Sequence, residues 1–186
     1  MRALCPWRVY LVKSNFELLA NYNLWINQRI YDSANKLDPE DLSKDKGAYF
    51  SSIIGTLNHI LVGDIIWLKR ISNHPDSFKS LKLMKEFADP VSLSEIVHPD
   101  LESLAQSRKV IDEAIINFIN EISEESILSE LDYINTKGNK FTKNLGFIIQ
   151  HLFNHQTHHR GQVTTMLFQS CIDVGETDLL ALIPSE

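Results

Sequence analysis

The chain has 186 residues, of which 44% are hydrophobic and 23% charged, and its formal net charge is -6. These values are typical of one soluble globular domain, here taken to span residues 1–186, that is long enough to bury a sizeable core. The negative charge argues against a general nucleic-acid-binding protein, because such proteins need clustered Lys and Arg to neutralise phosphates. We therefore expect no nucleic-acid partner.

The N-terminal segment and the cysteines indicate a compartment. Cys5 and Cys171 stand far apart and form neither a disulfide framework nor a metal-binding spacing. Pro6, Arg8 and Lys13 interrupt any signal-peptide apolar region. No stretch approaches the ~18 consecutive apolar residues of a membrane span. We expect a cytoplasmic protein with no membrane partner.

Apolar residues recur at helical spacing in four long stretches of the chain. This periodicity predicts helices over about 15–35, 49–72, 100–122 and 143–170. Residues 1–13 lack clear periodicity, so we assign them to a candidate N-terminal extension.

The connections between these helices carry turn signals. Pro39 predicts a stop and a turn after the first helix, because proline cannot continue a helix. Residues 131–142 predict a small hairpin, with Tyr133 and Phe141 as strand formers and Gly138 at the turn. The expected fold is all-α: an antiparallel four-helix bundle with a small β-hairpin before the last long helix.

The segment from His151 to Gln162 contains four of the seven histidines of the chain. On a helix, His155 and His159 share an inward stripe with apolar residues and lie one turn apart, near enough for both imidazoles to bind one ion. Burying two imidazoles without a shared partner is costly. His151 and His158 fall on a more polar stripe, where a hydrogen-bonding or interface role is expected.

Two imidazoles bind a metal weakly, so a third ligand should lie elsewhere. His59 is the best candidate, although its position is beside the inward stripe of the second helix and not in its middle. His158 could ligate instead if the last helix were rotated, and His151 follows it as an alternative. Three neutral imidazoles would leave a position open, as in catalytic zinc sites. By ligand type Zn²⁺, Ni²⁺ and Fe²⁺ all fit.

Other residues near the histidines have weaker signals. Candidate hydrogen-bond partners of the imidazole N–H groups are Asn58, Asp64 and Gln162. Arg160 is expected to form a salt bridge or to contact an anion or substrate. Trp25 and Trp67 are expected in the core or an interface, and His74 and His98, beside prolines, in solvated loops.

Residues 22–27, 49–68 and 154–162 resemble the DinB (damage-inducible) family, the last with the sequence Asn-His-Gln-Thr-His-His-Arg-Gly-Gln. The ending Thr177-Asp-Leu-Leu is also similar to that of the family. The resemblance implies a four-helix bundle, usually a homodimer, with a divalent metal held by three histidines. Carried over, these are His59, His155 and His159.

The same resemblance limits the expected chemistry. Related proteins in the wider superfamily are thiol S-transferases, which use bacillithiol or mycothiol, and maleylpyruvate isomerases, while many family members have no assigned reaction. No Ser or Cys nucleophile with a base and no carboxylate pair stands beside the histidines, so catalytic residues cannot be assigned. Our first hypothesis is a metal-dependent hydrolase or low-molecular-weight-thiol S-transferase. The alternative is a non-catalytic, metal-braced stress-response dimer.

Overall fold

The computed structural model describes residues 6–185, and side chains for residues 12–185. The chain is mostly helical and contains one small antiparallel sheet. Its elements, with η for short 3₁₀ helices, are α1 (Pro6–Ala34), α2 (Pro39–Ser43), α3 (Ile53–Ile71), η1 (Lys79–Lys85), α4 (Leu101–Glu121), α5 (Glu124–Leu128), β1 (Glu130–Ile134), β2 (Lys140–Asn144), α6 (Leu145–Gln169) and η2 (Leu179–Leu182).

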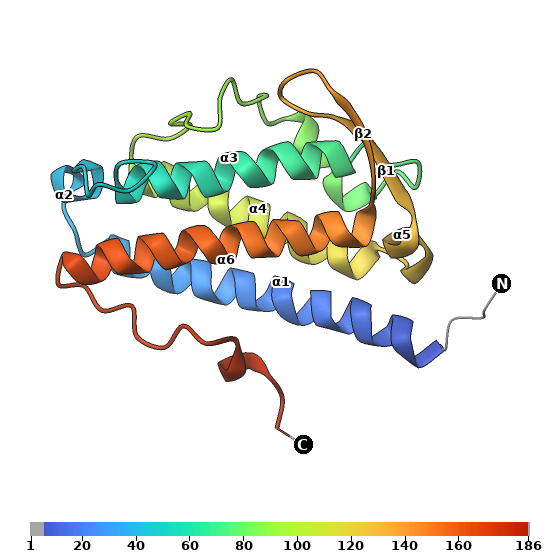
Figure 1. Ribbon diagram of the computed structural model, residues 1–186. Helices are drawn as coiled ribbons and strands as arrows, with labels where there is room; N and C mark the ends of the chain where they lie inside the picture. The colour runs from blue at the N-terminus through green and yellow to red at the C-terminus, as the bar shows by residue number, and fades with distance from the viewer. Residues whose placement is uncertain (1–5, 186) are drawn as a thin grey trace.

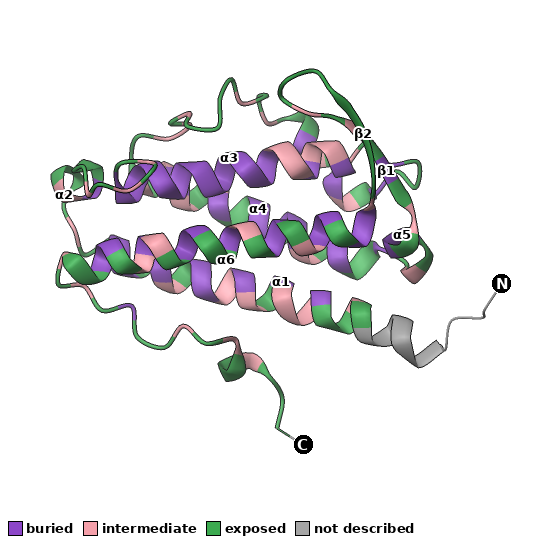
Figure 2. Cartoon of the chain, in the orientation of Figure 1, coloured by how far each residue is buried: buried purple, intermediate pink, exposed green. Residues whose placement is uncertain are grey.

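The four long helices α1, α3, α4 and α6 lie side by side along the molecule (Figure 1). Helix α1 packs against α4 and α6, and α3 packs against the same two helices. The core lies between them, with Ile30, Leu61, Ile115 and Leu152 as buried examples from the four helices. Figure 2 shows the resulting pattern: buried and exposed residues alternate around α4 and α6, whereas α3 is buried along almost its whole length. Apolar stripes at helical spacing therefore face the core.

The predicted hairpin is confirmed. Strands β1 and β2 are antiparallel, and Tyr133 pairs with Phe141. Gly138 has φ 82°, a left-handed conformation that glycine adopts without steric cost. The hairpin leads directly into α6, because the Asn144 side chain at the end of β2 accepts a hydrogen bond from the N–H of Phe147. The hairpin thus fixes where the histidine-bearing helix begins.

The starts of α3 and α4 follow the capping signals in the sequence. The Ser52 hydroxyl accepts from the N–H of Gly55 at 3.1 Å. The Asp100 carboxylate accepts from the N–H of Ser103 at 2.8 Å. Each cap satisfies a backbone donor that has no partner within its helix.

The predicted start of the first helix was wrong. Helix α1 begins at Pro6 and not near Asn15, so most of the proposed extension is helical; Cys5 lies outside the described residues. A periodic apolar pattern indicates a buried helix face, but a helix can continue where no face is buried. The lack of periodicity before Asn15 therefore did not mark the start of the helix.

The predicted stop and turn after the first helix are confirmed, because α1 ends at Ala34 and residues 35–37 form a turn. Pro39 then begins the short helix α2, which was not predicted, since proline is favourable at the first helical position.

Among the described residues, no helix is both long and apolar enough to cross a membrane.

Candidate metal centre

Helices α3 and α6 bring together the three histidines singled out in the sequence. His59 Nε2 lies 3.0 Å from His155 Nε2 and 3.1 Å from His159 Nε2. One ring nitrogen from each residue lies within 4.8 Å of the other two. Around an ion with metal–nitrogen bonds of 2.0–2.1 Å, neighbouring nitrogens are about 2.9 Å apart at a right angle and about 3.3 Å apart at the tetrahedral angle. The observed separations fit a single ion.

The hydrogen bonds of two rings define which nitrogen carries the proton. His59 Nδ1 lies 2.7 Å from the carbonyl oxygen of Leu93, which can only accept, so Nδ1 carries the hydrogen. His159 Nδ1 lies 2.8 Å from Gln162 Oε1 and is a donor in the same way. In the neutral rings both Nε2 atoms then carry lone pairs. The two Nε2 atoms lie 3.1 Å apart, so their lone pairs face each other. Two facing lone pairs repel each other unless a cation lies between them.

The protonation states of the cluster suit metal binding. Only 5% of His59 and 8% of His159 are exposed, and His155 is half-buried. Burial lowers the pKa of His59 and of His159. Burial, together with repulsion from His159 and His59, lowers the pKa of His155 to about 3. All three imidazoles are therefore neutral at pH 7, which is the form that ligates a metal.

Local sequence explains why the rings can meet. Gly63 faces His155 across the α3–α6 interface, and a Cβ added at Gly63 would lie 2.7 Å from His155 Cε1. Glycine is needed here because any side chain would occupy the space of the imidazole. Phe50 stacks on His59 with ring centroids 3.7 Å apart, and its ring meets His159 edge-on at 5.6 Å. This aromatic contact restricts how the two rings can turn.

The remaining histidines lie outside the cluster. His151 and His158 are on the exposed face of α6, as their polar stripe predicted. His74 was expected in a solvated loop, which was wrong: it is buried, and its Nε2 lies 2.9 Å from Ser129 Oγ. In the described part of the chain, the cluster contains no carboxylate or thiol.

The predicted partners of the imidazoles are only partly confirmed. Gln162 holds His159, whereas Asn58 bonds both the backbone carbonyl and the N–H of His98, at 2.9 and 3.0 Å. Asn58 thereby ties down the loop that brings the Leu93 carbonyl to His59. A backbone carbonyl in a loop has no sequence signature, so this partner could not be found from the residues alone.

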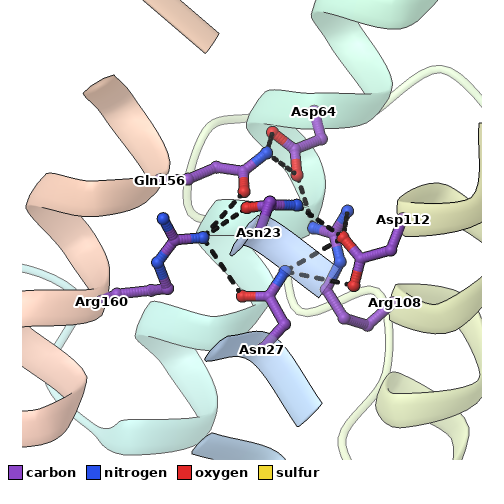
Figure 3. Close-up of polar contacts among 7 residues, drawn as sticks. All are labelled: Asn23, Asn27, Asp64, Arg108, Asp112, Gln156 and Arg160. Carbon is purple, nitrogen blue, oxygen red and sulfur yellow. Dashed lines mark hydrogen bonds and ion pairs between the residues drawn. The ribbon is translucent and has the colours of Figure 1, made fainter. Parts of the chain in front are cut away.

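A buried polar network lies on the inner side of the two helices that carry the cluster (Figure 3). At most 4% of any member is exposed. All four long helices contribute to it, through Asn23 and Asn27 of α1, Asp64 of α3, Arg108 and Asp112 of α4, and Gln156 and Arg160 of α6. Gln156 and Arg160 directly follow the ligand candidates His155 and His159 in the sequence, so the network and the cluster share one stretch of α6.

The charges in the network balance. Arg108 forms an ion pair with Asp64 and another with Asp112, the second at 3.0 Å. Gln156 Nε2 donates to both Asp64 oxygens at 3.0 and 3.1 Å. Burial raises the pKa of Asp64, and raises that of Asp112 to about 6, against the opposing effect of Arg108. Two arginines and two aspartates thus share one desolvated site.

Arg160 and Asp64 therefore have other roles than predicted. Arg160 Nη1 donates to the side chains of Asn23 and of Gln156, the latter at 3.1 Å. It forms no ion pair among the described residues and is 4% exposed, so it is not placed to meet a dissolved anion. Asp64 faces Arg108 and not an imidazole. These contacts hold the inner face of α6 against α1 and α3.

Fold and site define a mostly helical protein with a three-histidine candidate metal centre between two of its long helices. The model of the DinB family matches residues 11–185, and the chain belongs to this family. It is similar to Protein DinB of Bacillus subtilis (strain 168), with 27% identity over 160 residues that cover 86% of this chain and 88% of the relative. No solved structure matches the chain significantly.

Proposed function

We propose that the protein binds one divalent metal ion through the Nε2 atoms of His59, His155 and His159. The observation that carries this proposal is the meeting of the His59 and His159 lone pairs at 3.1 Å, since both Nδ1–H groups donate elsewhere. We further propose that the four long helices form the antiparallel bundle of the family and that α3 and α6 supply the ligands. Zn²⁺, Ni²⁺ and Fe²⁺ each suit three imidazoles.

Two reactions suit this site best. One is hydrolysis, and the other is the transfer of a low-molecular-weight thiol to an electrophile. A metal with three protein ligands keeps a position for water or substrate, and it lowers the pKa of a bound water or holds a thiol as thiolate. The chain's part is to keep the imidazoles neutral and oriented. Leu93 and Gln162 fix the tautomers of two rings, and Phe50 covers His59 on one face.

A non-catalytic role is the second candidate, and one observation favours it. The cluster joins α3 to α6 through side chains that are mostly buried, so a metal there would brace the two helices. Loss of stability on metal removal is expected from both candidates. Turnover separates them, because only the enzyme converts hydrolysable esters or amides, or conjugates a thiol.

Metal content per chain tests the proposal. Wild-type protein, His59→Ala, His155→Ala and the exposed control His158→Ala are reloaded with Zn²⁺, Ni²⁺ or Fe²⁺ and measured by elemental analysis. We expect about one equivalent in wild type and in His158→Ala, and little in the two cluster variants. No metal in reloaded wild-type protein would refute the site, and metal retained in His59→Ala would refute the choice of third ligand.

A homodimer and a small-molecule substrate complete the proposal. The support for the dimer is family membership. Sedimentation equilibrium should then give a mass near twice that of the 21.3 kDa chain. A monomer mass at micromolar concentration would contradict the dimer without affecting the metal site.

A further inference from the structure

A pocket of about 570 Å³ lies where α3, the hairpin and α6 meet. Its walls are mainly aromatic, with Trp67 from α3, Tyr133 from β1, and Phe147 and His151 from α6. Lys143 also lines it. None of these residues belongs to the three-histidine cluster, so the pocket is a separate feature.

The pocket adjoins the candidate metal centre along the same two helix faces. Two pairs of rings show that α3 and α6 run antiparallel here. The ring centroids of His59 and His159 are 4.4 Å apart, and those of Trp67 and His151 are 5.2 Å apart. Residue numbers thus rise along α3 as they fall along α6. The centroid of the His151 ring lies 6.0 Å from that of His155. The aromatic wall therefore begins one helical turn from a ligand candidate.

Two of the aromatic walls, Trp67 and Tyr133, are held in place by their neighbours. Trp67 and Tyr133 meet edge-on, with centroids 5.2 Å apart and an interplanar angle of 67°. The guanidinium of Arg70 lies over both rings, 4.7 Å from Trp67 and 5.0 Å from Tyr133. Tyr133 also stacks on Phe141 across the hairpin. A pocket whose walls are already ordered loses little side-chain freedom when a ligand enters.

Charge and exposure limit what the pocket can accept. Arg70 and Lys143 place positive charge beside the rings, which disfavours a cationic ligand. Phe147 is 79% exposed although it lines the pocket, so a large apolar surface remains in water. An uncharged aromatic or apolar group would remove that surface from water, which is favourable.

We propose that this pocket binds the aromatic or apolar part of a substrate whose reacting end is held at the three-histidine centre. The proposal rests on the metal-binding function proposed above and adds the substrate class to it. The site would select small molecules with a metal-binding head joined to an uncharged ring. Trp67, Tyr133 and Phe147 would determine that specificity.

Two metal-binding probes that differ by one ring test this proposal. Imidazole and 1-benzylimidazole are titrated into Co²⁺-loaded protein, and their binding is followed by the visible spectrum of the metal. We expect 1-benzylimidazole to bind at least tenfold more tightly than imidazole to wild type. The ratio should fall below about threefold in Phe147→Ala and in Trp67→Leu. Phe147 is exposed, so its replacement leaves the fold intact even if Trp67→Leu does not fold.

Phe168→Ala is the matched control, because Phe168 is 74% exposed on the same helix and does not line the pocket. It should keep the wild-type ratio. Equal affinities of the two probes in wild type, or a ratio unchanged in Phe147→Ala, would overturn the pocket while leaving the metal site standing. A loaded protein whose spectrum neither probe changes would also overturn it. Failure to load Co²⁺ would instead refute the metal site and the pocket with it.

Discussion

The Nε2 atoms of His59 and His159 lie 3.1 Å apart, yet neither is placed to donate a hydrogen to the other. The carbonyl of Leu93 and the side chain of Gln162 each take up the Nδ1–H of one ring. The two rings therefore present lone pairs to a common point, which His155 also reaches. A divalent cation bound at this point, as proposed above, would turn this repulsion into attraction.

Gln162→Leu should weaken metal binding by about 10–100-fold, because a partner that orients a ligating imidazole contributes that much to affinity. The variant keeps the side-chain volume but loses the acceptor for His159 Nδ1–H. A chelator competition titration measures the change, with exposed His158→Ala as the control. An affinity equal to that of wild type would show that Gln162 does not position the ligand.

Gly63→Ala should abolish most metal binding and destabilise the protein by about 1–3 kcal/mol, the usual cost of overpacking. The added Cβ would lie 2.7 Å from His155 Cε1 and force that ring out of the cluster. Urea unfolding and metal content measure the two effects.

Gly161→Ala is the matched control, since no atom of another described segment lies within 4 Å of a Cβ added there. It should be neutral or stabilising by up to about 1 kcal/mol, because alanine favours a helix interior. Equal behaviour of the two alanine variants would disprove the close approach of Gly63 to His155.

The sequence was informative wherever function or fold depends on local spacing. His155 and His159 share a face because they are four residues apart, and the structure places them together as the period predicts. The hairpin also followed from local signals, with Gly138 at the turn. The cluster was therefore visible in the sequence, where His59 was the best third candidate and the family resemblance supported it.

Contacts between distant segments were not predictable in the same way. The Arg108–Asp64 ion pair joins residues 44 positions apart, and the His59–Leu93 hydrogen bond joins a side chain to a loop carbonyl. Each depends on how the helices and loops pack, which a single sequence does not specify. Arg160 was misjudged for this reason, since its partners Asn23 and Gln156 become neighbours only after folding.

Asp64→Ala should destabilise the protein by about 3–5 kcal/mol, because it leaves Arg108 with one buried ion pair fewer. It also removes the acceptor for Gln156, which adjoins His155 in α6. Thermal or urea unfolding measures the effect, and Glu113→Ala, at an exposed position of α4, is the control with an expected change within about 0.5 kcal/mol. Similar values for the two variants would show that the network does not stabilise the fold.

Acid should destabilise the metal-free protein through its histidine cluster. In the unfolded chain a histidine titrates near pH 6.5, whereas burial and the neighbouring imidazoles lower the pKa of folded His155 to about 3. Between these values the unfolded state binds more protons than the folded state. The contribution to stability is therefore complete above about pH 6.5 and is lost progressively as the pH falls towards 3.

Urea unfolding of metal-free wild type and His155→Gln between pH 7.5 and 4 measures this contribution. Glutamine does not titrate, so the variant should lose less stability than wild type on acidification, and the two curves should converge or cross as the pH falls. Parallel curves for wild type and His155→Gln would mean that protons reach folded His155 as easily as unfolded, which contradicts its enclosed position between Gly63 and the other two imidazoles.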